Sequence, residues 1–232
     1  MEQYKKIVLN IPHSSTFMPI NTWEGDIYQE KQKWTDHKTD VIFSPRNHLT
    51  SQVVSVIFPY SRFFCDAERL ENDPLEKEGQ GIFYTDFNNC HRPHNMYLEE
   101  SVHLLWKSHQ KMLSSRIDSD STLLIDCHSF PSELAPDVDI CLGWNNDTSK
   151  PSEALIGLVN AYFGGFGYKV GLNNPYSNSI TPDNPYYYHS LMIELNKKIY
   201  LNEKTNELLC SAYKLNHAIN YLYKNILSEW KY

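Results

Sequence analysis

Two short apolar runs, each followed by a histidine, constrain the fold of this chain more than any other feature. The runs at 5–11 and 122–127 are rich in aliphatic and β-branched residues, and they lead to His13 and His128. Such runs, ending in polar residues, are typical of buried strands in an α/β sheet. Ligands of these sheets collect beyond the carboxyl ends of the strands. The sequence therefore predicts that both imidazoles reach the same edge of one sheet.

Strand-like and helix-like segments alternate along the whole chain. Strands are expected at 5–11, 52–58, 122–127, 138–143, 167–171 and 187–195, and helices at 35–43, 96–115, 151–162 and 204–229. This alternation predicts an α/β fold with a largely parallel or mixed sheet. The length of 232 residues fits one domain, 1–232, with a sizeable core. Two stretches, 70–95 and 172–187, show no regular pattern, and they are either lids and substrate walls or plain surface loops.

Charge and composition exclude several function classes. The formal net charge of -7 argues against a general nucleic-acid or anionic-membrane binder. No apolar stretch approaches the roughly 20 residues that span a bilayer, and the start of the chain shows no signal-peptide pattern. The five cysteines are scattered and odd in number, which fits reduced thiols in the cytoplasm. The sequence leaves the oligomeric state open.

The two histidines are candidate metal ligands. A lone histidine at a strand end is more often a hydrogen-bonded loop residue than a ligand. The repeated strand-then-histidine pattern, with Asp126 two positions before His128, favours a zinc site instead. Residues two apart on a strand share a face, so Asp126 is expected to orient His128 or to bind the metal itself.

A third ligand is needed, and Asp36 and Asp40 are the candidates. They are four residues apart, which would place them on one face of a helix. The alternative is that Thr35 caps this helix and that Asp36 only complements its dipole. Capping leaves Asp40 unexplained.

Arg62, Asp66 and Arg69 lie close together in an aromatic-rich stretch. Arginine near a metal site suits a two-pronged grip on a substrate carboxylate or the stabilisation of an oxyanion. A structural arginine–aspartate pair explains the same pattern about equally well.

Glu194 lies among apolar residues in the strand-like run 187–195. A buried carboxylate without a partner is costly, so the position predicts a functional role. Beside a metal-bound water it would act as general base and then as acid toward the leaving amine. The alternative is a strand-end glutamate turned to solvent.

Taken in order, these segments resemble the N-formylglutamate amidohydrolase family. The matching elements run from residue 7 to residue 203, and each is weak alone, but their shared order is specific. They are Pro12-His13-Ser14-Ser15, Thr35-Asp36 with Asp40, Ser61-Arg62 with Asp66 and Arg69, Trp106 with His109, Asp126-Cys127-His128-Ser129, Asp139 with Leu142-Gly143, the loop from Asn173 to Thr181, and Glu194-Leu195-Asn196 with Tyr200 and Glu203.

This resemblance implies a three-layer αβα fold related to zinc carboxypeptidases and aspartoacylases, with a mixed, largely parallel central sheet. It also implies a zinc-dependent hydrolase that cleaves the amide of a small N-acyl amino acid, with N-formylglutamate as the expected anionic substrate. His13, an acid and His128 look like the zinc ligands. Those relatives usually carry His-x-x-Glu, but position 16 is Thr16, so the acid is expected to be Asp36, or else Asp40.

The resemblance also suggests roles for the remaining residues. Glu194 and Arg62 are the expected catalytic residues, and Arg62, Arg69, Asn174 and Tyr176 are expected to bind substrate. His109 matches the family, but its role stays open. The family's Gly-Gly in the 173–181 loop is Asn178-Ser179 here, which predicts a changed pocket shape. Alternatives are a zinc carboxypeptidase or cell-wall amidase acting on a peptide, and a non-catalytic anion-binding relative.

Overall fold

A central six-stranded sheet organises the chain in the computed structural model, which describes residues 4–228. Its strands, in spatial order, are β2 (Val53–Ile57), β1 (Lys6–Ile11), β5 (Thr122–Phe130), β8 (His189–Asn196), β6 (Ile140–Gly143) and β7 (Val170–Leu172). The first four are parallel, whereas β6 runs antiparallel to β8. The predicted mixed, largely parallel sheet is therefore confirmed, and each predicted strand lies within three residues of an observed one.

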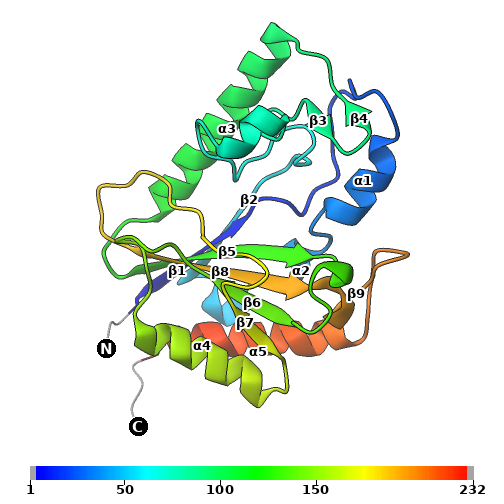
Figure 1. Cartoon of the computed structure of the whole chain (residues 1–232). Helices are drawn as coiled ribbons and strands as arrows, with labels where there is room; N and C mark the ends of the chain where they lie inside the picture. The colour runs from blue at the N-terminus through cyan, green and yellow to red at the C-terminus, as the bar shows by residue number, and fades with distance from the viewer. Residues whose placement is uncertain (1–3, 229–232) are drawn as a thin grey trace.

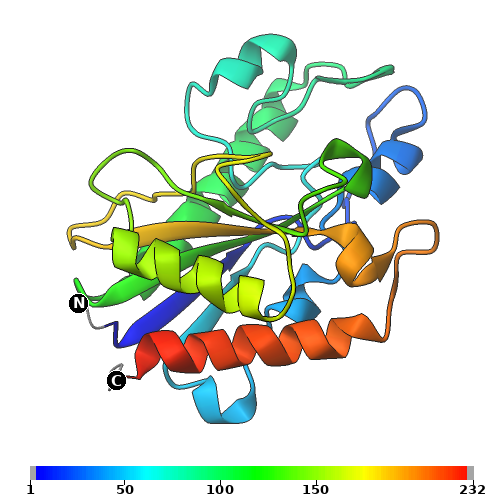
Figure 2. The same ribbon diagram turned by 60° about the horizontal axis from the view of Figure 1, so that its bottom comes forward.

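Helices cover both faces of the sheet, as the three-layer expectation requires. The helices α4 (Glu153–Gly165) and α5 (Ser211–Leu227) lie below the sheet in Figure 1 and cross its face in Figure 2. The short helix α2 (Thr39–Ile42) belongs to the same side, because its Ile42 joins the buried cluster that contains residues of α5. The long helix α3 (Met96–Arg116) lies on the other side with α1 (Ile27–Trp34). Within the described residues, no helix is long and apolar enough to cross a membrane.

Alternation along the strands gives the two faces of the sheet different chemistry. Odd-numbered residues of the central strands, such as Leu9, Ile125 and Ile193, join the largest buried apolar cluster with residues of α4 and α5. Even-numbered residues point to the side of α3. Some, such as Val8 and Leu124, are apolar and pack against α3. Others, such as Asp126, His128 and Glu194, are polar, and they form the floor of the site described below. The face that carries α4 and α5 is the principal core.

Side-chain caps explain where two of the helices begin. Asn95 accepts a hydrogen bond from the Leu98 amide at the start of α3, and Ser152 does the same for the Leu155 amide in α4. Each satisfies a backbone donor that the first helical turn leaves free. These two helices correspond to those expected at 96–115 and 151–162.

The two other helix predictions need correction. The segment 35–43 is not one helix, because α1 ends at Trp34 and α2 begins only at Thr39. Thr35 has an extended backbone at the end of α1, and its hydroxyl makes no hydrogen bond within residues 4–228, so it does not act as the N-cap of a helix. Asp36 lies in the connection, and Asp36 and Asp40 therefore do not share a helical face.

The predicted start of the last helix at residue 204 was also wrong, because a small hairpin precedes α5, which begins at Ser211. Its strands are β9 (Leu201–Asn202) and β10 (Glu207–Leu208), and Asn206 in the turn has a φ of 55°. The predicted end at residue 229 lies outside the described residues. The irregular stretch 70–95 holds a 3₁₀ helix (Pro74–Glu78) and the short strands β3 (Asp86–Phe87) and β4 (Cys90–His91).

Candidate metal and catalytic site

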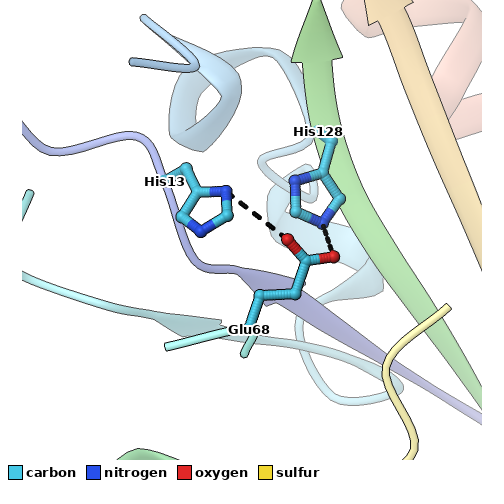
Figure 3. Close-up of side chains that lie close together, drawn as sticks. All are labelled: His13, Glu68 and His128. Atoms are coloured by element: carbon cyan, nitrogen blue, oxygen red, sulfur yellow. Dashed lines mark ion pairs between the residues drawn. The ribbon is translucent and has the colours of Figure 1, made fainter. Parts of the chain in front are cut away.

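His13, Glu68 and His128 form the group that could hold a metal ion (Figure 3). His13 follows β1, His128 lies near the end of β5, and Glu68 belongs to the segment after β2, so three neighbouring strands deliver them. One ligand atom from each lies within 4.8 Å of the others. The Glu68 carboxylate is 3.7 Å from His13 Nδ1 and 3.2 Å from His128 Nε2. The two histidines predicted to meet do so.

The hydrogen bonding of the two imidazoles indicates which nitrogens are free for a ligand. His13 Nδ1 and His128 Nε2 are buried and make no hydrogen bond within the described residues. The opposite nitrogens are engaged: His13 Nε2 lies 2.7 Å from an Asp66 oxygen, and His128 Nδ1 lies 3.2 Å from an Asp36 oxygen. Histidines that bind metals usually have this carboxylate partner, which fixes the ring and its tautomer.

The electrostatics of the group also favour a cation. Burial alone would raise the pKa of Glu68, but the interactions with His128 and the charge of His13 together outweigh it and lower the pKa to about 2. Burial would lower the pKa of His128, yet Glu68 and Asp126 raise it well above its usual range. An ionised carboxylate and two imidazoles in a field that attracts positive charge form a donor set that suits zinc.

Asp36 and Asp40 have different positions relative to this group. Asp36 is buried beside both histidines, 3.2 Å from His128 Nδ1 and 3.8 Å from His13 Nδ1. Asp40 lies on α2 and is not among the residues that line the pocket. Glu68, which the sequence did not single out, completes the group. The available signal was its place in Asp66-Ala67-Glu68-Arg69, between a predicted site aspartate and a predicted site arginine.

Arg62, Arg69 and Tyr84 surround the single carboxylate of Asp66. Arg62 Nη2 donates to Asp66 Oδ2 at 3.1 Å, and the Tyr84 hydroxyl donates to the same oxygen at 2.7 Å. Arg69 Nη2 donates to the Tyr84 hydroxyl at 3.1 Å. Burial alone would raise the pKa of Asp66, but His13 and the two arginines hold it well below its usual range. The structural pair is therefore present, and both arginines also line the pocket.

Glu194 lies beside the metal-binding group on the polar face of the sheet. It is the register partner of His128 across the β5–β8 pair, and it is only 8% exposed, so it is not turned to solvent. Its Oε2 makes no hydrogen bond within the described residues. Burial raises the pKa of Glu194 to about 8, although the charge of His128 opposes the shift. Carboxyls shifted in this way toward neutral pH are typical of acid–base sites.

A buried chain of polar side chains connects His109 to the site. His109 Nε2 is 2.9 Å from Asn10 Oδ1, and Asn10 Nδ2 donates to Asp126 Oδ1 at 2.8 Å. The same Asp126 oxygen lies 3.0 Å from His128 Nε2. Burial lowers the pKa of His109 to about 4, so its ring is neutral at pH 7. Because Asn10 presents its carbonyl oxygen, His109 donates from Nε2.

His13, Asp36, Glu68, His128 and Glu194 line one pocket of about 750 Å³. Of the predicted substrate-binding residues, Arg62, Arg69 and Tyr176 contribute to its wall, whereas Asn174 does not. The irregular stretches 70–95 and 172–187 both supply wall residues, which supports their interpretation as substrate walls.

Comparisons with known proteins point the same way. A crystal structure of N-formylglutamate amidohydrolase from Ralstonia eutropha superposes with a TM-score of 0.79 at 17% identity, covering 97% of this chain and 93% of that one. The crystal structure of a gene product from Agrobacterium tumefaciens gives a TM-score of 0.66 at 14% identity, covering 96% and 92% of the two chains. These similarities show a shared fold. No curated protein matches the sequence.

The sequence itself gives the family. The family model for N-formylglutamate amidohydrolase matches residues 5–201, which is most of the chain and includes every group described above. The earlier resemblance is thus confirmed, and with it a hydrolase that acts on a small substrate. The chain belongs to the N-formylglutamate amidohydrolase family.

Proposed function

We propose that this protein is a zinc-dependent hydrolase that cleaves the amide of a small N-acyl acidic amino acid, with N-formylglutamate as the reference substrate. Hydrolysis of that substrate yields formate and glutamate. The observation that carries the proposal is the position of two buried nitrogens, His13 Nδ1 and His128 Nε2. They make no hydrogen bond within the described residues, and they lie 3.7 and 3.2 Å from the Glu68 carboxylate.

His13, Glu68 and His128 would hold the zinc ion. Asp36 and Asp66 each engage the opposite nitrogen of one histidine, so we assign them to orienting the rings. This assignment replaces the expected Asp36 with Glu68 as the acidic ligand. When bound, zinc would lower the pKa of a water to near 7 and polarise the substrate carbonyl.

Glu194 serves as the general base. It lies in the pocket next to His128, and one of its oxygens has no protein partner within the described residues. Glu194 takes a proton from the attacking water and then gives it to the departing nitrogen. A carboxyl with a raised pKa can both accept and release this proton near neutral pH.

Arg62 and Arg69 bind the substrate carboxylates. The two guanidinium groups share one buried carboxylate, Asp66, so their charges exceed that of their common partner. Both remain accessible from the pocket, with side-chain exposures of 17% and 18%. The excess positive charge favours an anionic substrate.

Metal analysis combined with a formate-release assay tests this proposal. We expect about one zinc per chain and formate release from N-formylglutamate that stops on chelation and returns with added zinc. Unchanged metal content in both His13→Ala and His128→Ala would exclude the metal site. Cleavage of a peptide or cell-wall fragment without cleavage of N-formylglutamate would retain the hydrolase and exclude the substrate. Bound metal with no turnover of any of these would favour a non-catalytic relative.

A further inference from the structure

The pocket is larger than N-formylglutamate requires. That molecule has roughly 12 non-hydrogen atoms, whereas pockets of about 300–1,000 Å³ typically enclose drug-sized ligands. The volume of about 750 Å³ is therefore more than this substrate would fill. A formyl group is the smallest possible acyl group, so a substrate with a larger acyl group would occupy some of the space that N-formylglutamate leaves empty.

The two sides of the pocket differ in charge. Arg62 and Arg69 follow β2, at one edge of the sheet, and they bring two guanidinium groups to a charged side of the pocket that Glu68 and Asp73 also line. The opposite side is the loop 173–181, which returns over β6 and β8. Cys141 on β6 donates its thiol to the Tyr176 carbonyl. His128 and Glu194, on β5 and β8, lie between these sides in the strand order. If the substrate amide lies at Glu194, its carboxylates would therefore point toward Arg62 and Arg69, and its acyl group would point toward the loop.

Several contacts fix the loop in this position. At Gly143 any Cβ would come within 2.8 Å of the Asn178 carbonyl oxygen, so glycine there permits the close approach. The Asn145 side chain donates to the Ser179 carbonyl and accepts from its amide. The Ile180 amide donates to Asp126. The loop is thus held to the same carboxylate that contacts His128.

Asn178 adopts a backbone conformation that is typical of glycine, and it adds a polar side chain. Its φ of 75° lies in the left-handed region, which glycine favours and asparagine tolerates. The chain therefore retains a glycine-like path where the family has Gly-Gly. Asn178, Ser177 and Thr181 all line the pocket, and none of their side chains makes a hydrogen bond within the described residues. This wall consequently offers an uncharged set of donors and acceptors.

We propose that the loop 173–181 forms an acyl subsite for an uncharged, amide-bearing acyl group larger than formyl, with Asn178 as its specificity residue. This inference rests on the proposed function. The reaction is the same hydrolysis: the oxygen of water bonds to the carbonyl carbon, the carbon–nitrogen bond breaks, and the nitrogen takes a proton from Glu194. Only the acyl half of the substrate changes.

Three glutamate derivatives test the subsite through glutamate release. They are N-formylglutamate, N-butyrylglutamate and N-(formylglycyl)glutamate, and the last two differ mainly in the amide of the acyl group. We expect kcat/KM for the formylglycyl compound to exceed that for the butyryl compound by about tenfold, as a hydrogen bond to Asn178 would give. Asn178→Gly should bring this ratio close to one, because glycine keeps the backbone and removes the amide. Asn72→Gly is the matched control, since Asn72 also has a positive φ of 65° but lies outside the pocket.

Each outcome decides the inference. A tenfold ratio that disappears in Asn178→Gly and persists in Asn72→Gly supports it. If N-formylglutamate is cleaved but the ratio is near one, or survives Asn178→Gly, the acyl subsite is wrong and the proposed function stands. If none of the three compounds releases glutamate from the zinc-loaded protein, the proposed substrate class and the acyl subsite are both wrong.

Discussion

The two faces of the central sheet are built from the same strands and yet have opposite chemistry. On the face toward α4 and α5, side chains such as Leu9, Ile125 and Ile193 are fully buried in one apolar cluster. On the other face, Asn10, Asp126, His128 and Glu194 occupy the intervening positions, and they are also buried. One face stabilises the fold through apolar burial, whereas the other holds ionisable groups that water would otherwise solvate.

This difference shows how an α/β sheet can hold a costly polar cluster. Strand alternation separates the two sets of side chains without any change in backbone path. The polar groups tolerate burial because most of them engage each other, as in the chain from His109 through Asn10 to Asp126. The buried atoms that make no hydrogen bond within the described residues include His13 Nδ1, His128 Nε2 and Glu194 Oε2, and a bound metal and substrate would supply partners for these three.

The largest expected effect lies on the polar face, at Glu194. Glu194→Gln keeps the side-chain shape and removes the proton acceptor, so kcat should fall ~100- to 10,000-fold. Zinc content should stay near that of the unaltered protein, because Glu194 is outside the metal-binding group. Steady-state kinetics with metal analysis checks both. A near-normal kcat would mean that another residue is the general base.

On the apolar face, a substitution should lower the stability and leave kcat nearly unchanged. Ile125 is fully buried between the sheet and its helices, so Ile125→Ala should lower the free energy of unfolding by about 2–5 kcal/mol. Denaturant titration measures this loss. Below the melting transition, kcat should stay within about twofold of normal. A large loss of kcat in a fully folded Ile125→Ala protein would mean that the two faces are not separable.

The pH dependence of stability tests the buried His109. Its folded pKa of about 4 lies below the ordinary 6.5, so the unfolded chain binds the extra proton first as the pH falls. Stability should therefore decrease as the pH drops from about 6.5 toward 4, by up to about 3 kcal/mol from this group. His109→Gln keeps a donor toward Asn10 without titrating. Denaturant titrations of both proteins across this window should show a shallower slope for the variant, and equal slopes would contradict the assignment.

The smallest effect is expected at the cationic wall of the pocket. Arg62→Lys keeps the charge but loses the planar, two-donor grip, so KM for N-formylglutamate should rise about tenfold. N-formylalanine lacks the side-chain carboxylate and should be a poorer substrate of the unaltered protein. Kinetics with both compounds tests this. Equal kcat/KM values for N-formylglutamate and N-formylalanine would show that the arginines do not select the substrate.

The sequence by itself determined the strands, the chemistry of their alternating faces and the place of the histidines. Residues 5–11 and 122–127 could be assigned because a buried strand is a local pattern of apolar residues. His13, His128, Arg62 and Glu194 followed from their positions relative to those strands, and the family motifs placed them in one site. Local patterns therefore gave the α/β class and most members of the site.

Only the tertiary structure decided which groups meet. Glu68 lies in an irregular segment, where no periodicity indicates the direction of a side chain, and it became visible only beside His13 and His128. Asp36 seemed to belong to a helix with Asp40, but α1 ends before it, and the turn presents its carboxylate to His128 Nδ1. Likewise, the hydrogen-bonded series His109, Asn10 and Asp126 joins three separate segments of the sequence. Such contacts depend on how strands and loops pack across the sheet, which no local pattern encodes.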